Sequence, residues 1–412
     1  MRFLSLLLNR AIQTGRLTIT DYDGSVHVFG PGTDQGGDDL NEVAIRLTKR
    51  GVSGKIARDP ALGAAEAYMD GHLEMEAGHE IYDLLKLVTY NLRWVPGNAL
   101  HKVTQQPRCK TWWDGKNHAR RAKRNVAHHY DLSDHLYDLF LDANRQYSCA
   151  YWRPENTDDL AEAQSDKLAH IAAKLLLKPG MRVLDIGCGW GGMALYLNKV
   201  AGVEVLGVTL SEEQLIVARQ RAEAAGVADK VKFELIDYRA VAGPFDRIVS
   251  VGMFEHVGVP QYQTYFSKVA ELLSEDGVAL IHSIGRADGP GATDSFMAKY
   301  IFPGGYVPAL SEITPKIERA QLWVTDIEIL RLHYARTCEA WYKTCVEKKD
   351  EITALYDEKF WRMWVFYLAG AAMAFRHMGQ MVFQVQLAKS IDAVPLTRDY
   401  IAETERHYAR LV

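Results

Sequence analysis

Several features are scarce in this chain of 412 residues, and each shortage narrows the class of protein. The five cysteines are scattered and form no C-x-x-C pair, which argues against a zinc or redox site and favours a reducing cytoplasm. There is no low-complexity tract or internal repeat, so an ordinary folded chain is expected. A formal net charge of -4 gives no overall attraction to nucleic acid, and no nucleic-acid partner is expected.

Long hydrophobic runs are also missing. The apolar stretch 3–8 ends at Asn9 and Arg10, too early to serve as the core of a signal peptide. A second uncharged stretch, 363–375, is closed off by Arg362 and Arg376 and falls short of the roughly 20 apolar residues that a membrane span needs. We therefore expect a cytoplasmic protein in which the second stretch forms a buried helix.

The length and the 48% hydrophobic content are sufficient for two domains. Two β-rich runs, 17–20 and 26–29, flank a turn at 21–24 and predict a hairpin. Helices are expected near 60–69 and 80–93. We predict a small N-terminal α+β domain over 1–105, a basic linker over 106–127 and a catalytic domain over 128–412.

The region around the linker has an unusual charge balance. Between residues 102 and 124, eight lysines and arginines stand against the single acid Asp114, and Trp112 and Trp113 lie among them. Two interpretations stay open. The segment is either a solvated connector, or a surface that attracts anionic lipid headgroups with the tryptophans at the membrane interface.

From residue 182 onward, short apolar runs alternate with helical stretches, which is typical of a parallel sheet covered on both faces. The sequence therefore predicts an α/β fold with a seven-stranded sheet. The expected strands are 182–186, 203–208, 231–236, 246–251, 278–284, 322–330 and 381–387.

A glycine-rich turn follows the first of these strands, with Gly187 and Gly189 allowing the backbone to pass close to a ligand. The same residues fit the G-x-G-x-x-G pattern of dinucleotide enzymes, so the turn alone does not exclude them. The second strand, however, ends in Thr209 and Leu210 without the acid that usually binds a dinucleotide ribose. Ser211 and Gln214 form a capping box, which makes the intervening glutamates residues of a helical first turn.

One further side chain favours a cationic cofactor over a pyrophosphate, and two others suit an adenine. Asp185, two residues before the first glycine, is an acceptor suited to the amino-acid end of a sulfonium compound. Asp237 and Tyr238 follow the third strand and provide an acceptor and a flat ring for an adenine.

An ordered set of motifs indicates a family. The chain resembles the cyclopropane-fatty-acyl-phospholipid synthases, relatives of the mycolic acid cyclopropane synthases. The motifs that carry the resemblance are HYDLSD at 129–134, YSCAYW at 147–152, VLDIGCGWGG at 183–192, TLS at 209–211, DYR at 237–239, FEHVG at 254–258, HSIG at 282–285, IFPGG at 301–305 and HY at 333–334.

The resemblance implies a methyltransferase fold, S-adenosylmethionine as cosubstrate and a bound bicarbonate ion as base. It implies that Cys149, Glu255, His282, Ile284 and Tyr334 form the catalytic set. Glu255 and His282 would orient and polarise the anion, and Tyr334 would donate a hydrogen bond and present its ring to a passing cation. Cys149 and Ile284 would contribute backbone groups or shape. Because a carboxylate beside bicarbonate is a like-charge pair, Glu255 is expected to share a proton or to lean on His282.

The cofactor set combines both lines of reasoning. The resemblance assigns Tyr130, Tyr147 and Ser148 to the cofactor site, and it implies that Tyr130 lies in a lid over the cofactor. The other residues are assigned both by the resemblance and by their positions after the strands. The full set is Tyr130, Tyr147, Ser148, Asp185, Gly187, Gly189, Thr209, Leu210, Gln214, Asp237 and Tyr238. No metal site is expected, since the adjacent His128 and His129 would diverge on a helix.

The predicted activity is transfer of a methylene from S-adenosylmethionine to the cis double bond of a phospholipid acyl chain. The resemblance also implies a homodimer, and we expect the enzyme at the inner face of the membrane, with the N-terminal domain contacting lipid. Three rivals remain: a methyltransferase acting on an amine or hydroxyl of a small molecule, a dinucleotide-dependent oxidoreductase, and a non-catalytic lipid carrier. The helix at 360–375 fits the wall of an acyl tunnel, but core packing explains the same composition and is favoured for the helix taken alone.

Overall fold

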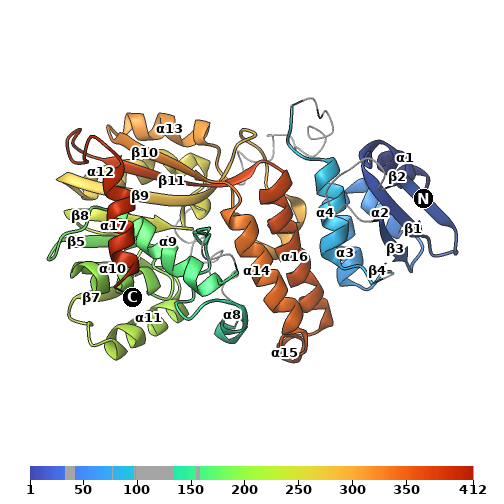
Figure 1. Cartoon of the computed structure of the whole chain (residues 1–412), viewed down its shortest axis with the longest axis horizontal. Helices are drawn as coiled ribbons and strands as arrows, with labels where there is room; N and C mark the ends of the chain where they lie inside the picture. Colours follow the sequence, from blue (N-terminus) through green and yellow to red (C-terminus); the bar gives the residue numbers. More distant parts are fainter. Residues whose placement is uncertain (33–41, 77, 97, 99–132, 155–157, 412) are drawn as a thin grey trace. The chain divides into compact units, whose positions relative to one another are not determined.

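The computed structural model describes the whole chain except residues 33–41, 77, 97, 99–132, 155–157 and 412 (Figure 1). Contacts within the chain define two compact units. Unit 1 comprises Met1–Pro107, Ala292–Phe302 and Ala335–Gln380, and unit 2 comprises Arg108–Gly291, Pro303–Tyr334 and Met381–Val412. The predicted linker, 106–127, lies outside the described residues.

Unit 2 is built on the predicted seven-stranded sheet, with the strand order β10-β11-β9-β8-β5-β6-β7. The pairs β5–β6, β5–β8, β6–β7 and β8–β9 are parallel, whereas β10 and β11 pair antiparallel. All seven expected strands are present, and β9 begins five residues earlier than predicted. The bounds are β5 Arg182–Ile186, β6 Glu204–Thr209, β7 Val231–Leu235, β8 Phe245–Val251, β9 Leu273–Arg286, β10 Trp323–Leu330 and β11 Gln380–Ala388.

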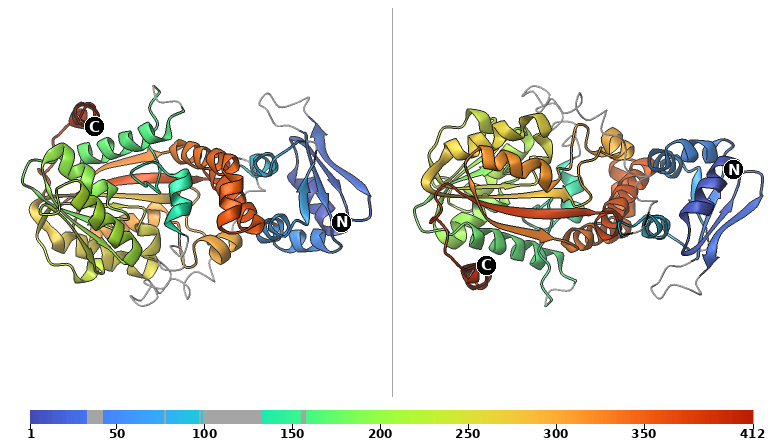
Figure 2. Two further views of the ribbon diagram at one scale, coloured as in Figure 1. Left: turned by 90° about the horizontal axis from the view of Figure 1, so that it is seen from below. Right: turned by 90° about the horizontal axis from the view of Figure 1, so that it is seen from above.

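Helices cover both faces of this sheet (Figure 2). Neighbouring strand residues such as Leu184 and Val183 belong to different cores, because successive side chains of a strand point to opposite faces. One core contains residues of α9 Leu160–Lys174, α10 Gly192–Ala201, α11 Glu212–Ala224 and α17 Asp399–Ala409. The other contains residues of α12 Tyr262–Leu272 and α13 Leu310–Arg319. The central apolar runs read from the sequence, such as β5 and β9, are therefore strands buried on both sides, whereas the edge strands β7 and β10 are partly exposed.

Unit 1 contains a four-stranded sheet in the order β2-β1-β3-β4, formed by β1 Gly15–Thr20, β2 Val26–Gly32, β3 Glu42–Leu47 and β4 Leu73–Met75. The predicted hairpin is confirmed by the antiparallel pairing of β1 with β2, in which Thr20 lies opposite Val26. Four helices accompany this sheet in the first hundred residues: α1 Arg2–Ala11, α2 Val52–Arg58, α3 Pro60–Met69 and α4 Ile81–Asn91.

Three later helices complete unit 1: most of α14 His333–Glu347, α15 Lys349–Leu355 and α16 Glu358–His377. The structure thus divides the chain differently from the predicted limits, since 292–302 and 335–380 were placed in the catalytic domain. The reason is packing: α16 contacts α3 and α4, and the rings of Phe366 and Tyr68 lie 6.2 Å apart. Core packing therefore accounts for the apolar composition of α16. Within the described part of the chain, no helix combines the length and apolarity needed to cross a bilayer.

The tight packing of the sheet predicts a cost for adding a single methyl group at Gly207 on β6. A Cβ there would lie 2.5 Å from Phe233 Cδ1 and 2.9 Å from Cys188 Cβ. We expect Gly207→Ala to lower the free energy of unfolding by about 1–3 kcal/mol, because overpacking forces neighbours out of their rotamers. Chemical denaturation followed by circular dichroism measures this loss.

Gly370→Ala is the matched control for this variant. Gly370 lies inside α16, and a Cβ there meets nothing within 4 Å. The change should stabilise unit 1 by up to about 1 kcal/mol through helix propensity. A Gly207→Ala protein as stable as wild type would contradict the packing described.

Candidate active site

A pocket opens at the carboxyl end of the parallel strands, where open α/β sheets bind their ligands. Its walls come from the ends of β5, β6 and β8, from the loop after β7 and from the segment 145–148. It lies entirely within unit 2. The topology, with β5 between β6 and β8, brings these separate chain segments to one edge of the sheet.

The glycine turn forms one wall of the pocket. Gly187 and Gly189 have φ values of +82° and +54°, in the left-handed region that favours glycine. A Cβ at Gly187 would lie 2.8 Å from the side chain of Met253. The backbone N–H groups of Gly187 and Cys188 donate to the carbonyl of Val208 at 2.9 and 3.1 Å, which fixes the turn to the end of β6.

The structure brings the predicted cofactor residues together. Ten of the eleven line this one pocket: Tyr147, Ser148, Asp185, Gly187, Gly189, Thr209, Leu210, Gln214, Asp237 and Tyr238. The eleventh, Tyr130, lies outside the described residues. Half of the predicted capping box is present, since the Gln214 N–H donates to Ser211 Oγ at 3.3 Å. The Gln214 side chain accepts instead from Thr209 Oγ1 at 3.0 Å. The individual contacts of these pocket residues with a cofactor stay predictions.

Asp185 is the acid buried in this pocket. Its side chain is almost fully buried, and among the described residues its Oδ2 has no hydrogen-bond partner. Burial raises the pKa of Asp185 to about 7, although the charge of Lys167 opposes this shift. An orphaned buried acceptor is costly unless a ligand satisfies it, so the site favours a group that is cationic or donates hydrogen bonds.

Lys167 is a pocket-supporting residue that the sequence reasoning missed. It lies on α9 with no exposed surface, and its Nζ donates to Ser148 Oγ at 3.0 Å and to Gln146 Oε1. Gln164 Nε2, one turn earlier, donates to the carbonyls of Gln146 and Ser148 at 3.2 and 3.0 Å. Burial lowers the pKa of Lys167 to about 8. These bonds fix the segment that forms one pocket wall.

At the opposite wall, Asp237 is engaged by a neighbour that the prediction did not include. Arg239 Nε donates to Asp237 Oδ1 at 2.8 Å. Burial acts to raise the pKa of Asp237, but the hydrogen bonds and charge of Arg239 outweigh it and lower the pKa. Tyr238 packs edge-on against Tyr265, with ring centroids 5.4 Å apart. Asp237 is thus an ionised acceptor beside an oriented ring.

Three of the five predicted catalytic residues meet at the ends of β8 and β9. Glu255, in the short helix Phe254–His256, accepts a hydrogen bond at Oε1 from the Ile284 N–H at 2.6 Å. His282 lies two residues earlier on β9, where its carbonyl accepts from the Gly252 N–H at 2.9 Å. Burial raises the pKa of Glu255 to about 7, and Oε2 has no partner among the described residues. Glu255 leans on the Ile284 backbone, not on His282.

The other two, Cys149 and Tyr334, are buried and lie in segments that touch. The His333 Nδ1 accepts a hydrogen bond from the Trp152 N–H at 2.8 Å, which joins the start of α14 to the loop after Cys149. Burial raises the pKa of the Cys149 thiol, so it is not a thiolate nucleophile. Of the described residues that line the pocket, none belongs to the predicted catalytic set.

The fold and the glycine-turn pocket define the class: an S-adenosylmethionine-dependent methyltransferase fold with a seven-stranded sheet. Within this class, residues 117–385 match the family described as mycolic acid cyclopropane synthetase. The chain belongs to this family. The predicted family and fold class are confirmed.

Three relatives illustrate the similarity. The chain is 43% identical to a "probable fatty acid methyltransferase" from Pseudomonas putida, over 86% of this chain and 87% of the relative. It is 36% identical to the cyclopropane-fatty-acyl-phospholipid synthase of Escherichia coli K12, over 84% of this chain and 88% of that protein. A solved structure of the mycolic acid cyclopropane synthase CmaA1, complexed with SAH and CTAB, has a TM-score of 0.62 and 34% identity, covering 65% of this chain and 98% of its own.

The raised pKa of Asp185 predicts a pH-dependent affinity for S-adenosylmethionine. Its pKa of about 7 means that the carboxyl is protonated below this pH and must lose the proton to face a cation. We expect the dissociation constant to fall as the pH rises from about 6 to about 8, with a limiting slope of about tenfold per pH unit on the acid side. Calorimetry at three pH values measures this slope.

Asp185→Asn is the control, because an amide does not titrate and should flatten the profile over this window. Lys167, with a pKa of about 8, is the neighbouring group that begins to titrate at the alkaline end. If the variant kept the wild-type slope, another group would be responsible.

Proposed function

We propose that this enzyme transfers a methylene from S-adenosylmethionine to the cis double bond of an unsaturated phospholipid acyl chain, with bicarbonate as the base. The family and its relatives support S-adenosylmethionine-dependent cyclopropanation of lipids as the activity, and the chain is an enzyme of this type. The observation on which the proposal rests is the presence of two buried acids, Asp185 in the pocket and Glu255 between β8 and β9, each with an oxygen that has no partner among the described residues.

Asp185 and the glycine turn would hold the cofactor. The unpartnered Oδ2 of Asp185 fits a cationic amino-acid group, and the left-handed glycines let the backbone approach it. Tyr238 and Asp237 would contact the adenine. When bound, S-adenosylmethionine supplies an electrophilic methyl carbon on a sulfonium. These assignments are supported by the common pocket of the ten residues and by the relative solved with SAH.

The reaction requires a base beside an apolar chain. The alkene electron pair forms a bond to the methyl carbon while the C–S bond breaks toward sulfur. The resulting carbocation then closes to a three-membered ring as a proton leaves the new carbon. A small anion can accept this proton where an enzyme carboxylate would intrude on the acyl chain.

Glu255 fits a bound bicarbonate in its protonated form. Its Oε1 is occupied as an acceptor by the Ile284 N–H, whereas Oε2 is buried and unpartnered. With a pKa raised to about 7 by burial, Glu255 can carry a proton on Oε2 and donate it in a hydrogen bond to the anion. This removes the like-charge conflict between a carboxylate and bicarbonate. His282, Tyr334, Cys149 and Ile284 would complete the cradle.

A phospholipid substrate is favoured over a mycolic acid by the extent of the matches. The phospholipid synthase from Escherichia coli matches 84% of this chain, whereas the mycolic acid synthase CmaA1 covers only 65%. The family match begins at residue 117, so the additional shared length includes the N-terminal part. That part carries the membrane surface proposed below.

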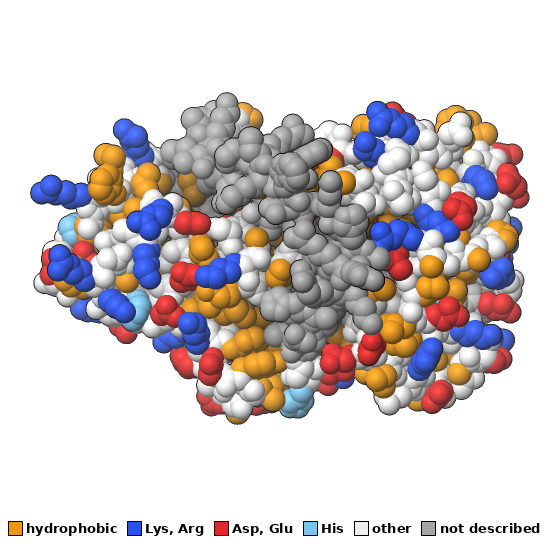
Figure 3. All heavy atoms as spheres, turned by 180° about the vertical axis from the view of Figure 1, so that it is seen from behind, with side chains coloured by type: hydrophobic (Ala, Val, Ile, Leu, Met, Phe, Trp, Pro, Cys, Tyr) orange, Lys and Arg blue, Asp and Glu red, His pale blue; other side chains and the backbone are white. Residues whose placement is uncertain are grey.

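We propose that α1 docks the enzyme on an anionic bilayer. One face of the helix is anchored through Leu4, which is buried, while Phe3, Leu6 and Leu7 are 81%, 56% and 40% exposed. Arg2 and Arg10 are exposed beside them, and the helix contains no acid. An exposed apolar face flanked by arginines suits the boundary between headgroups and acyl chains. Figure 3 shows hydrophobic side chains beside lysines and arginines at the N-terminal end.

The proposal also includes the oligomeric state and the location. By the resemblance, the enzyme is a homodimer, and it is located in the cytoplasm, attached peripherally to the inner face of the membrane. The basic, tryptophan-bearing segment 102–124, which lies outside the described residues, would add to the attraction. Sedimentation of the enzyme alone and with vesicles tests both points.

A second product deserves a test because the relative from Pseudomonas putida is described as a fatty acid methyltransferase. Loss of a proton from a neighbouring carbon, instead of the new methyl group, would give a methyl-branched alkene. This isomer has the same mass as the cyclopropane. Mass spectrometry of vesicle lipids therefore has to be combined with proton NMR, in which the high-field ring methylene signals identify the cyclopropane.

Substitutions of Glu255 test its role as a hydrogen-bond donor. Glu255→Leu removes both functions, and we expect kcat to fall by about two to three orders of magnitude. Glu255→Gln can still accept from Ile284 and donate from its amide, so it should retain more activity than the leucine variant. Turnover on vesicles and the dissociation constant for the cofactor are measured for both.

The control for these variants is Glu223→Gln, an exposed glutamate on α11, which should match wild type. Turnover should also fall in bicarbonate-depleted buffer and recover when bicarbonate is added. If the glutamine and leucine variants were equally inactive while both bound the cofactor, the carboxylate itself would be the proton acceptor.

The α1 surface is tested with the triple variant Phe3→Ser, Leu6→Ser, Leu7→Ser. We expect at least about a tenfold weaker partition into anionic vesicles, because each apolar side chain contributes about 1 kcal/mol or more when it leaves water. Activity on detergent-dispersed phospholipid should stay unchanged. Ile216→Ser, with 56% exposure on α11, is the control. Wild-type vesicle binding by the triple variant would refute this docking surface.

A further inference from the structure

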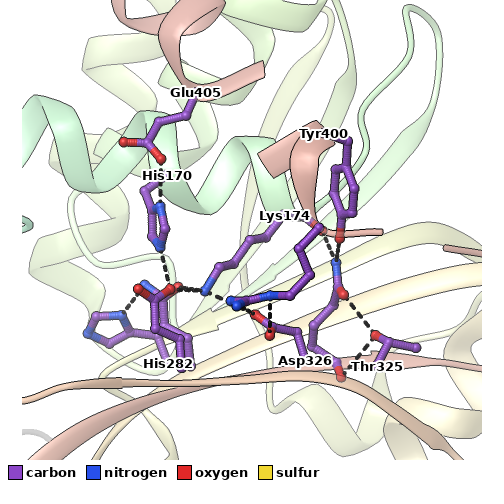
Figure 4. A network of polar contacts seen from close by, with 11 residues as sticks. His170, Lys174, His282, Thr325, Asp326, Tyr400 and Glu405 are labelled. Carbon is purple, nitrogen blue, oxygen red and sulfur yellow. Dashed lines mark hydrogen bonds and ion pairs between the residues drawn. The ribbon is translucent and has the colours of Figure 1, made fainter. Parts of the chain in front are cut away.

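A buried polar network runs from β9 through β11 and α9 to α17, all within unit 2 (Figure 4). We infer that Gln384 and Lys174 are positioning residues that hold His282 in the tautomer with its proton on Nε2, so that His282 faces the active site as a hydrogen-bond donor. The tautomer follows from the hydrogen-bond geometry around His282, whereas its use in catalysis rests on the proposed function.

The orientation of the Gln384 amide is set by Lys174. The Lys174 ammonium has only donors, and its Nζ lies 2.9 Å from Gln384 Oε1. The amide cannot be reversed, since its NH₂ group would then face the ammonium. Gln384 Nε2 is therefore the atom that lies 3.2 Å from His282 Nδ1.

This orientation decides the state of the imidazole. Because Gln384 Nε2 is a donor, His282 Nδ1 must accept and carries no proton. Burial, reinforced by the charges of Lys167 and Lys174, holds the pKa of His282 well below its usual range, so the ring is neutral. Its one proton is left on Nε2. Figure 4 shows this second nitrogen pointing away from the network.

Lys174 can fix the amide because its own position is determined by acids. Its Nζ has no exposed surface and pairs with Glu328 Oε2 and with Asp326 Oδ2, the latter at 3.5 Å. Gln386 Nε2 donates to the Lys174 carbonyl at 2.6 Å, which also ties the end of α9 to β11. A buried ammonium with these partners has little freedom to turn away from Gln384.

The same network holds a second histidine, His170, between two acids. His170 Nε2 lies 2.7 Å from Glu328 Oε2, and its Nδ1 lies 2.9 Å from Glu405 Oε2. Burial acts to raise the pKa values of both acids, but the hydrogen bonds and charge of His170 outweigh it and lower them. Both nitrogens of His170 therefore face carboxylate oxygens, whereas the Nδ1 of His282 faces an amide donor.

This tautomer separates the role of His282 from that of the base. A His282 Nε2–H can donate to an anion but cannot take a proton at that atom. Removal of the proton from the alkylated carbon must then fall to another group, as the bicarbonate proposal requires. Gln384 and Lys174 would act on the reaction only through His282.

The tautomer is read directly by NMR of protein labelled with ¹⁵N-histidine, with His282 assigned by through-bond connectivity and by its loss in His282→Asn. In wild type we expect a protonated Nε2 and an unprotonated Nδ1. In Gln384→Glu, a carboxylate oxygen would face Nδ1 and draw a proton to it. We expect a protonated Nδ1 and a kcat lowered by about tenfold or more, with cofactor affinity unchanged.

Gln220→Glu provides the matched control, since it makes the same change at an exposed position on α11, outside the network. It should leave the His282 signals unchanged. A wild-type His282 protonated on Nδ1, or a Gln384→Glu spectrum identical to wild type, would overturn the inference, and the wild-type measurement holds even if a variant fails to fold. The expected tautomer without cyclopropane formation would instead refute the proposed function.

Discussion

The burial of charge on α9 is the constraint on which the rest of unit 2 depends. Lys167 and Lys174 have no exposed surface, and His170 is nearly as buried. Removing a charged group from water costs several kcal/mol unless it is paired and hydrogen-bonded. The partners therefore have to arrive from elsewhere in the chain, and they do so from β10, β11, α17 and the segment 146–148. Pairing the buried charges of this one helix fixes four separate parts of the fold.

This helix supports both halves of the site. Its N-terminal half holds the wall of the cofactor pocket through Gln164 and Lys167. Its C-terminal half holds His282 through Lys174 and Gln384. Because such a network is costly when only partly satisfied, its members must assemble together. The cofactor pocket and the catalytic cluster are thereby coupled through a rigid element that touches neither cofactor nor substrate in the proposed mechanism.

Two acids with the same pKa of about 7 serve different purposes in this scheme. Asp185 and Glu255 are both raised by burial, and each keeps one oxygen without a partner among the described residues. Beside Asp185 lies Lys167, and a bound cation would complete its ionisation. Glu255 instead faces a site proposed for an anion, which favours the protonated form. The charge of the ligand, and not the intrinsic acidity, separates the two roles.

The sequence alone determined the elements and most of the pocket. Strands buried on both faces leave a local hydrophobic signature, and the glycine turn, the cap at Ser211 and the acid Asp185 are fixed by their place after a strand. The family motifs identified Glu255, His282 and Ile284, which the structure brings together, and left the exact partners of Glu255 open.

Only the tertiary structure decided which polar residues are buried and which distant segments pack together. Gln164, Lys167, His170 and Lys174 recur at helical spacing, a pattern that in sequence is typical of a solvent-facing stripe. The partners of His170 and Lys174, which are Glu328, Gln384 and Glu405, lie more than 150 residues away, as the pairing of His170 with Glu328 over 158 residues illustrates. The assignment of α16 to unit 1 has the same origin. Local periodicity specifies a helix, but the burial of its charges and apolar faces depends on contacts between remote parts of the chain.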